Sequence, residues 1–585
     1  MGALRFLLPF LRPRSASLVG GAAAVVAGAA AGAVAPLVVR AAVDALRTGT
    51  TPTAIALYAA AVVGIAVVRG VFRYLQRRTI YGVSRDVETD VRDALFANLL
   101  RQPPAFLDRL STGDVLSRFS NDLGAIRMVL GPGLLFGIDT FVTVSLAIGF
   151  MAAIDPALTA WALLPLVGVS VAVKILGRRL HRRSRASQQA LAEVSTAVQE
   201  NLSGLRVVRA YGREDAARRR FREESEAYVD ANMALARVRA VLSPLLTLLL
   251  GAGLLVVLWI GGRRVATGAI TLGDFVAFTM YVGMIGWPMI AVGWITNLFQ
   301  RAASAGRRLE SILFAEPAIH DGSADPGARP ERGRISLRDV TLRYASDREA
   351  ALRGVDLEIP AGTVLGVTGP TGGGKSSLVR LLPRLYEPDT GAVEIDGRPI
   401  AEYPLSALRG VIGIAPQEPF LFSATLRENL AFGLDDDRPP EERDRRVEEV
   451  AAVAGLAGDV AGFPRGYDTP VGERGVTLSG GQKQRAALAR AVLSDPRILI
   501  LDDAFSSVDT ATEERILDRL GEVFEGRTTI LVSHRVSTLR HADRIVVIDE
   551  GRIVERGSHE ELVERDGWYA ELDRRQRLEA EIETT

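Results

Sequence analysis

The feature that most constrains the fold is a series of six long apolar stretches within the first 300 residues. Each approaches or exceeds the roughly 20 residues that a helix needs to cross a hydrocarbon core about 30 Å thick. Backbone polar groups in lipid have to be paired within the chain, so we expect six membrane-spanning helices. The stretches cover residues 16–46, 53–76, 128–153, 156–177, 240–262 and 274–300.

The first stretch has some features of a cleaved signal peptide. Arg5, Arg12 and Arg14 precede an apolar run that ends near an A-x-A-like site around residue 34. That run is longer than a typical signal core, and five further spans follow it. We therefore interpret it as an uncleaved first helix.

Basic residues indicate the orientation of these spans. The loops 77–127 and 178–239 contain 8 and 14 arginines, whereas the opposite loops contain only Arg47, Arg263 and Arg264. The positive-inside rule therefore places the N-terminus and the C-terminal part in the cytoplasm. Both basic loops read as long polar helices.

Within the first span, Arg40 and Asp44 are four residues apart and are expected to form an i,i+4 ion pair.

The composition changes after Phe314. Residues 315–334 are rich in Pro, Gly, Asp and Arg and read as a linker, and short β-branched runs follow from Ile335 onward. The first 300 residues carry a net charge of +13 and the rest −12. This segregation predicts a membrane domain followed by a soluble domain. The absence of cysteine excludes a disulfide-stapled secreted scaffold.

The strongest motif is Gly369-Pro-Thr-Gly-Gly-Gly-Lys-Ser376, which lies between an expected strand at 363–368 and an expected helix at 376–382. Its glycines allow backbone N–H groups to wrap phosphates, Lys375 supplies a positive charge, and the Ser376 hydroxyl can ligate Mg²⁺. Lys375 is also one of only three lysines in the chain. The predicted phosphate-binding residues are Gly369, Thr371, Gly372, Gly373, Gly374, Lys375, Ser376 and Ser377.

Two further segments complete a phosphate-transfer pattern. Arg497 and the apolar run 498–501 are followed by Asp502 and Asp503. Asp502 is placed to hold Mg²⁺ through water, and position 503 to orient or deprotonate the attacking water. We call the glycine-rich motif Gly369–Ser376 the P-loop. Between it and this run lies the segment Leu478-Ser-Gly-Gly-Gln482, here called the signature segment, which opens a helix ending near Leu493. Its predicted nucleotide-binding residues are Ser479, Gly480, Gly481 and Gln482.

With this spacing the chain resembles the ABC transporter ATPases, and its whole length resembles an exporter-type half-transporter. The resemblance implies a multidomain membrane protein with an all-α, six-helix transmembrane domain at 1–314. A linker at 315–334 and an α/β nucleotide-binding domain at 335–585 follow. It also implies ATP and Mg²⁺ as cofactors and an ATPase activity coupled to transport.

The family pattern assigns further residues one by one. Tyr344 is similar to the aromatic residue that stacks on adenine, and Gln417 to the glutamine that senses the γ-phosphate and Mg²⁺. His534 matches the switch histidine, Asp509 lies in a D-loop-like segment, and Glu473 matches a loop that faces the membrane domain. In this family two ATPase domains close head to tail around two ATPs. The cytoplasmic tips near 112–119 and 211–217 are similar to coupling helices.

Asp503 departs from the family pattern, which usually has Glu at this position. Asp is one methylene shorter, so its carboxylate lies on the order of 1–1.5 Å farther from the water. A misplacement near 1 Å can lower a rate about 10²-fold. ATP binding is expected to survive because Lys375, Ser376 and Asp502 are intact. The pattern resembles the degenerate-site subunit of bacterial heterodimeric multidrug exporters; the alternative is a homodimeric exporter or lipid flippase that tolerates Asp503.

The expected function is ATP-driven export of amphipathic drugs, lipids or peptides across the cytoplasmic membrane. The expected partners are a second half-transporter bearing Glu at this position, the lipid bilayer and the substrate, with no nucleic acid. A membrane regulator in which ATP only gates conformation is a further alternative. Cavity-lining and lipid-facing residues are alike in sequence, so the sequence does not identify the substrate.

Overall fold

The computed structural model describes residues 2–584 apart from 323, 345–348, 435–437, 473–474 and 476. The chain forms two compact units. The first contains Met1–Leu100 and Thr112–Ala315, and the second contains Arg101–Ser111 and Glu316–Thr585.

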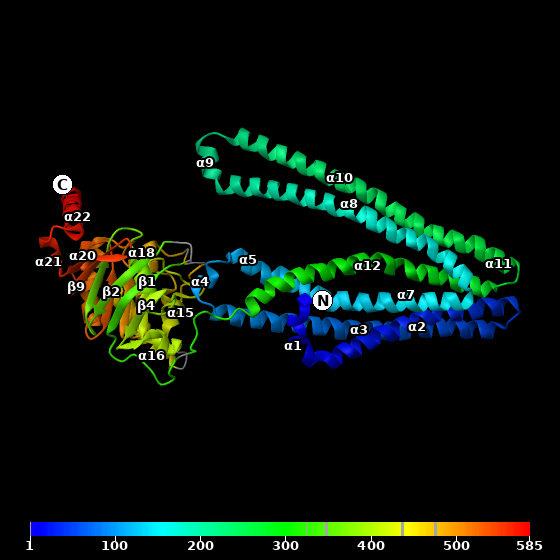
Figure 1. The fold of residues 1–585 in the computed structure, drawn as a ribbon, viewed down its shortest axis with the longest axis horizontal. Helices are drawn as coiled ribbons and strands as arrows, with labels where there is room; N and C mark the ends of the chain where they lie inside the picture. Colours follow the sequence, from blue (N-terminus) through cyan, green and yellow to red (C-terminus); the bar gives the residue numbers. More distant parts are fainter. Residues whose placement is uncertain are drawn as a thin grey trace. The chain divides into compact units, whose positions relative to one another are not determined.

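The described part of the first unit is helical (Figure 1). Short π-helical turns at Arg118–Asp122, Val129–Gly133 and Val257–Gly261 interrupt otherwise continuous helices. Its helices are α1 (Leu8–Leu11), α2 (Ser15–Arg47), α3 (Pro52–Arg101), α5 (Thr112–Ser117), α6 (Leu123–Met128), α7 (Leu134–Ile154), α8 (Pro156–Ser203), α9 (Leu205–Ala210), α10 (Glu214–Val256), α11 (Gly262–Ala266) and α12 (Leu272–Leu313).

Among the described residues, five helical stretches are long and apolar enough to cross a membrane. They are Leu4–Arg47, Pro52–Arg101, Thr112–Ile154, Thr247–Ala266 and Leu272–Leu313, and each overlaps a predicted span. The remaining predicted span, 156–177, lies in α8, where the apolar described segment is Pro156–Pro165. The predicted helical character of this half of the chain is therefore confirmed.

The two long helices α8 and α10 form an extended hairpin. They pack side by side, and the short helix α9 joins their far ends (Figure 1). This hairpin corresponds to the predicted polar helices around 184–236, which continue without a break from the apolar segments.

Ion pairs at the ends of the spans join different helices. Arg40 Nε lies 2.8 Å from Asp274 Oδ1, and Asp44 instead accepts hydrogen bonds from the Thr271 hydroxyl (2.8 Å) and the Gly273 N–H (2.9 Å). The predicted pair between Arg40 and Asp44 is therefore wrong. Both side chains turn toward the start of α12, where Arg40 pairs with the Asp274 carboxylate. Asp44 accepts there from a hydroxyl and a backbone N–H that an intrahelical pair would leave open.

Gly273→Ala is expected to destabilise the membrane unit by about 1–3 kcal/mol, the range of an overpacked contact. A Cβ atom at residue 273 would lie 2.3 Å from the carbonyl oxygen of Arg40. Gly283 on the same helix has no atom within 4 Å of such a Cβ, so Gly283→Ala is the matched control. Thermal unfolding of the purified full chain in detergent checks this, and equal transition temperatures for the two variants would contradict it.

The second unit contains two β-sheets. A four-stranded antiparallel sheet has the order β2-β1-β4-β5, and a six-stranded sheet has the order β10-β9-β3-β8-β7-β6, parallel except for β10. The strands are β1 (Ile335–Leu342), β2 (Leu352–Ile359), β3 (Val364–Thr368), β4 (Thr390–Ile395), β5 (Arg398–Pro399), β6 (Ile412–Ala415), β7 (Ile498–Asp502), β8 (Thr528–Val532), β9 (Arg544–Asp549) and β10 (Arg552–Gly557).

The central strands of the parallel sheet are buried on both faces. In β7 the side chains of Ile498 and Ile500 enter one hydrophobic core, and those of Leu499 and Leu501 enter the other. This explains the continuous apolar runs, since a strand covered on both faces has no polar side. The helices of this unit are α4 (Pro104–Leu107), α13 (Lys375–Leu381), α14 (Leu405–Gly410), α15 (Leu426–Leu430), α16 (Pro440–Val453), α17 (Ala457–Ala461), α18 (Gly480–Leu493), α19 (Thr510–Phe524), α20 (Val536–Leu539), α21 (His559–Glu564) and α22 (Trp568–Thr584).

The loop between α3 and α5 belongs to the second unit. Residues Arg101–Ser111, including α4, group with Glu316–Thr585, whereas α5 belongs to the helical unit. The predicted coupling segment at 112–119 thus lies in the first unit, just after the segment that groups with the second unit. Pro103 and Pro104 break α3 just before α4, and this signal in the sequence marks the tip correctly.

Candidate functional site

The parallel sheet brings four predicted segments to one edge. The P-loop follows β3, Gln417 lies two residues beyond β6, Asp503 follows β7, and His534 lies two residues beyond β8. Because the carboxyl ends of parallel strands meet at the same edge, ligands of such sheets bind there. Of these residues Gln417 is exposed, while Lys375, Asp502 and Asp503 are buried.

The P-loop backbone requires glycine at several positions. Gly369, Gly372 and Gly374 have positive φ angles of +140°, +83° and +112°. A Cβ at Gly369 would lie 2.0 Å from the carbonyl oxygen of Ile548, whereas Gly372 has no neighbouring atom within 4 Å of such a Cβ. The loop is thus packed against β9 on one side and open beside Gly372, where a ligand can approach the backbone closely. Thr371 is exposed on this open side.

Lys375 is held at the mouth of the loop. Its side chain is buried, and Nζ donates hydrogen bonds to the carbonyl oxygens of Gly369 and Pro370, both at 2.9 Å. Burial lowers the pKa of Lys375, and the nearby carboxylates of Asp503 and Asp502 oppose this shift. The ammonium group therefore sits in a poorly hydrated position, where contact with a phosphate oxygen is stronger than in water.

Ser376 and Asp502 bring together oxygen atoms of the kind that Mg²⁺ prefers. The Ser376 hydroxyl donates to Asp502 Oδ1 at 3.3 Å. Burial raises the pKa of Asp502, whereas the Ser376 hydrogen bond lowers it. Mg²⁺ is usually held by one or two such groups together with phosphate oxygens and water, so this donor pair fits the ion.

Asp503 and His534 lie next to each other. His534 Nε2 is 3.4 Å from Asp503 Oδ2, and Asp503 is buried with a left-handed backbone at φ +47°. Burial lowers the pKa of His534, although the Asp503 carboxylate acts in the opposite direction. The lowered pKa favours the neutral imidazole, in which one ring nitrogen donates a hydrogen bond and the other accepts one.

Two residues that the sequence reading missed hold the surrounding loops. Gln484 Nε2 donates to the Ser506 hydroxyl at 2.6 Å, and its Oε1 accepts from the Ser507 N–H at 2.7 Å. Gln576 on α22 donates to the His534 carbonyl at 2.7 Å and accepts from the Val536 N–H at 2.9 Å. The only sequence signal for Gln484 is its place just after the signature segment, and none marks Gln576.

The signature segment lies at the N-terminus of α18. Ser479 caps this helix, since its hydroxyl accepts from the Gln482 N–H at 3.3 Å, and Gln482 in turn donates to Asp459 at 2.8 Å. A Cβ at Gly481 would lie 2.9 Å from the carbonyl oxygen of Ser507, so the signature packs against the D-loop. Asp509 of that loop caps α19 through the Thr512 N–H at 2.9 Å.

Tyr344 lies just beyond β1 and contacts the P-loop helix. Its hydroxyl is 2.9 Å from the Ser377 hydroxyl, and its ring is partly buried against the core of the first sheet. This brings the predicted base-stacking residue beside the predicted phosphate loop. Glu473 lies outside the described residues.

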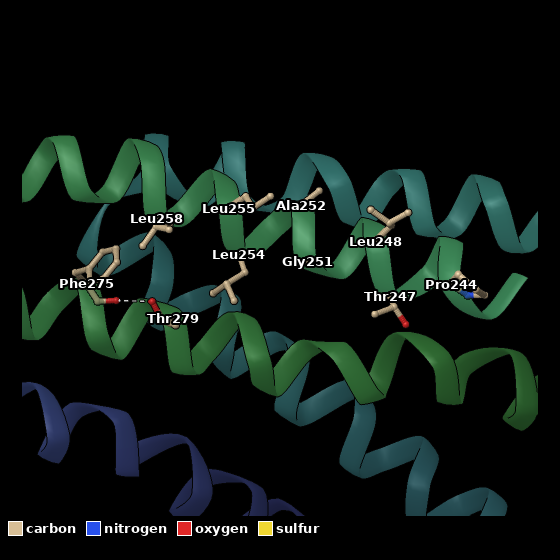
Figure 2. A pocket seen from close by; sticks show the side chains of 10 residues that line it. All are labelled: Pro244, Thr247, Leu248, Gly251, Ala252, Leu254, Leu255, Leu258, Phe275 and Thr279. Carbon is tan, nitrogen blue, oxygen red and sulfur yellow. Dashed lines mark hydrogen bonds between the residues drawn. The ribbon is translucent and has the colours of Figure 1, made fainter. Parts of the chain in front are cut away.

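A cavity of about 950 Å³ lies between α10 and α12 in the first unit. Figure 2 shows leucine side chains of α10 near Phe275 and Thr279 of α12. Thr279 donates its hydroxyl proton to the carbonyl oxygen of Phe275 at 2.9 Å, so this hydroxyl is satisfied within its own helix. The cavity is therefore apolar. Its lining is Pro244, Thr247, Leu248, Gly251, Ala252, Leu254, Leu255, Leu258, Phe275 and Thr279.

The fold and the site define a protein with membrane-spanning helices and a fused P-loop ATPase domain. Residues 18–289 match the family model of the ABC transporter transmembrane region, and residues 352–506 match the model described as ABC transporter. The Escherichia coli (strain K12) multidrug resistance-like ATP-binding protein MdlA is 36% identical over 531 residues, which cover 90% of this chain and 89% of that protein.

Two further comparisons agree. The ATP-dependent lipid A-core flippase of Chromohalobacter salexigens is 36% identical over 533 residues, with 89% of each chain covered. The solved structure of a bacterial Atm1-family ABC exporter with ATP bound has a TM-score of 0.79 at 28% identity, covering 97% of this chain and 99% of that one. The chain belongs to the ABC transporter family. It is a multi-pass membrane protein of the exporter type, with an ATP-binding ATPase domain coupled to transport.

Proposed function

We propose that this chain is one half of a heterodimeric exporter that moves amphipathic substrates outward across the cytoplasmic membrane. Its N-terminus and ATPase domain lie in the cytoplasm, which the arginine-rich loops support. The observation that carries the proposal is Asp503 beside an otherwise complete set of nucleotide-binding residues. This chain binds ATP with Mg²⁺ at Ser376 and Asp502, and the partner supplies the competent hydrolysis.

The contacts of Asp503 support a weak catalytic role. Its carboxylate lies 3.4 Å from His534 Nε2, so the short side chain is engaged by the switch histidine. A glutamate at this position would extend one methylene farther into the site. Hydrolysis at this site is therefore slow, because an attacking water requires a base at hydrogen-bond distance.

The signature segment supports the unequal partnership. Ser479 and Gly480 are exposed at the N-terminus of α18, where they are accessible to the nucleotide of a second chain. In this proposal they complete the competent site of the partner, together with Gly481 and Gln482. Tyr344, Gln417 and Asp509 act in this chain's own site and its interface.

Exposed apolar side chains support a partner chain. At the end of the α8–α10 hairpin, Leu202, Val207 and Tyr211 are 67%, 61% and 78% exposed. In the second unit the rings of Phe420, Phe422 and Phe432 form an exposed aromatic cluster, with Phe422 stacked on Phe432 at 4.7 Å. Apolar groups of this kind mark protein interfaces, so we place the hairpin tip of each subunit on the ATPase domain of the other.

The apolar cavity between α10 and α12 supports an amphipathic substrate. Its volume of about 950 Å³ is at the upper end of typical small-molecule pockets, and its lining offers hydrocarbon to an apolar moiety. Two relatives point to candidate classes, since one is named for multidrug resistance and another for lipid A-core flipping. Drugs and lipids are therefore the first substrates to test.

Inside-out membrane vesicles containing the paired complex test the transport function. ATP is expected to drive accumulation of a fluorescent amphipathic dye, and a labelled lipid A analogue in a parallel assay tests the flippase alternative. A Lys375→Ala variant combined with Gly480→Asp impairs both nucleotide sites and serves as the control. ATP binding and conformational change without accumulation of any substrate would instead support the regulator alternative.

A further inference from the structure

The tip of the first cytoplasmic loop is anchored on the ATPase part of the chain. Residues Arg101–Ser111 form part of the second unit, and Ala105 of α4 packs against the core of the four-stranded sheet. Asp108, at the end of α4, accepts a hydrogen bond from the hydroxyl of Tyr386 at 2.9 Å. One tyrosine hydroxyl thus holds the end of the loop helix.

In this structure the orientation of Tyr386 is set by its packing and by the hydrogen bond to Asp108. It lies between α13 and β4, its side chain is only 9% exposed, and its ring is part of the hydrophobic core. Burial, together with the hydrogen bond to Asp108, raises the pKa of Tyr386 to about 12. The phenol is therefore protonated at neutral pH and is the donor in this hydrogen bond.

The same ring touches the predicted base-stacking residue. Tyr344 meets Tyr386 edge to face, with 5.0 Å between ring centroids and an interplanar angle of 86°. The Tyr344 hydroxyl is in turn 2.9 Å from the hydroxyl of Ser377 on the P-loop helix. An unbroken series of contacts therefore runs from Ser377 through Tyr344 and Tyr386 to Asp108.

We propose that Tyr386 is a positioning residue that transmits the occupancy of the base site at Tyr344 to Asp108 and the loop 101–111 of the same chain. A base stacked on Tyr344 reorients that ring, and the close edge-to-face contact passes the movement to Tyr386 because packed rings move together. The Tyr386 hydroxyl then shifts or releases Asp108. The proposal rests on the proposed role of Tyr344 in nucleotide binding and adds a route within one subunit.

Hydrogen–deuterium exchange of the full chain in lipid nanodiscs tests this route, with and without Mg²⁺ and ATP. The wild-type chain is expected to show an ATP-dependent change in deuterium uptake at residues 101–111. In Tyr386→Phe and Asp108→Ala this change is expected to fall about ten-fold, the factor for one hydrogen bond to a charged acceptor. Asp108→Asn keeps an acceptor oxygen for the tyrosine hydroxyl and is expected to retain the change.

Tyr403→Phe is the matched control, because Tyr403 is also buried in this unit and donates to the carbonyl oxygen of Ile395 at 2.8 Å. It removes a comparable hydrogen bond away from the loop and is expected to respond like wild type. The double variant Tyr386→Phe/Asp108→Ala is expected to lose no more than either single variant, since both remove the same bond. ATP affinity is measured on the same samples and is expected to stay within about three-fold of wild type.

An undiminished ATP response at 101–111 in Tyr386→Phe would overturn the proposal. So would a wild-type chain that binds ATP without any change in this segment, even if the paired complex transports substrate. Failure of the wild-type chain to bind ATP would instead contradict the proposed function and, with it, this route. Asp108→Ala, which leaves the Tyr386 ring in place, gives an independent measurement should Tyr386→Phe unfold.

Discussion

Replacing Gly480 by Asp in this chain is expected to lower the ATPase activity of the paired complex about 100-fold. This large effect is expected even though the P-loop and Asp503 of this chain form the slower of the two hydrolysis sites in the proposal. In the proposed heterodimer this signature faces the nucleotide bound by the partner. A carboxylate at position 480 would stand against the γ-phosphate, and like charges brought together at an interface cost several kcal/mol. A loss of about 2.7 kcal/mol of transition-state stabilisation corresponds to the 100-fold decrease.

The fold tolerates the Gly480→Asp substitution, so a loss of ATPase activity would not be due to unfolding. A Cβ at Gly480 would lie 3.3 Å from Ser507 Cβ, a contact that needs only a small adjustment. Gly521→Asp on α19 adds the same charge at an exposed position with no atom within 4 Å of the new Cβ, and it is the control. Steady-state ATPase of the complex, purified through a tag on this chain, gives the result. Activity of Gly480→Asp equal to that of Gly521→Asp would contradict the assigned role.

Adding Asp503→Glu to Gly480→Asp in the same chain is expected to raise ATP hydrolysis about 100-fold over Gly480→Asp alone. In the proposed heterodimer, Gly480→Asp inactivates the partner's nucleotide site but leaves the site of this chain, which the partner's signature segment completes. The extra methylene carries the carboxylate on the order of 1 Å farther toward the water, and a correction of that size is worth about 10²-fold in rate. In the otherwise wild-type complex the same substitution should raise total turnover only about two-fold, because one competent site is already working.

The double variant also separates the heterodimer from the homodimer. In a homodimer both signatures would carry the Gly480→Asp substitution, so Asp503→Glu could not restore hydrolysis at either site. Asp503→Asn in the Gly480→Asp background is the control for a change of side chain without a longer carboxylate. Absence of recovery in the complex, with ATP binding intact, would show that residue 503 is not what limits this site.

Much of the nucleotide site could be predicted because its chemistry is encoded in short, contiguous motifs. The P-loop requires glycine at 369, 372 and 374 for positive φ, and these appear directly in the sequence. Asp502 ends an apolar run and His534 follows a β-branched one, and the structure has these two runs as β7 and β8. The structure brings the ends of these two strands together at one edge of the parallel sheet.

Contacts between distant residues could not be predicted in the same way. Asp108 and Tyr386 are 278 residues apart, and neither belongs to a motif that indicates the other. Arg40 and Asp44 had a plausible local pairing, but both contact the start of α12, some 230 residues away in the sequence. Likewise, the cavity between α10 and α12 depends on which helix faces pack together. The apolar sequences of these helices have no distinct polar face that would indicate which side packs against a neighbour.

The most direct test of the unequal-site account is the steady-state ATPase activity of this chain purified alone, compared with the complex that it forms with its partner in the same lipid. The account predicts activity near background for the chain alone and about 100-fold more for the complex. Turnover of about one ATP per second or faster by the isolated chain, within the ordinary enzymatic range, would contradict it.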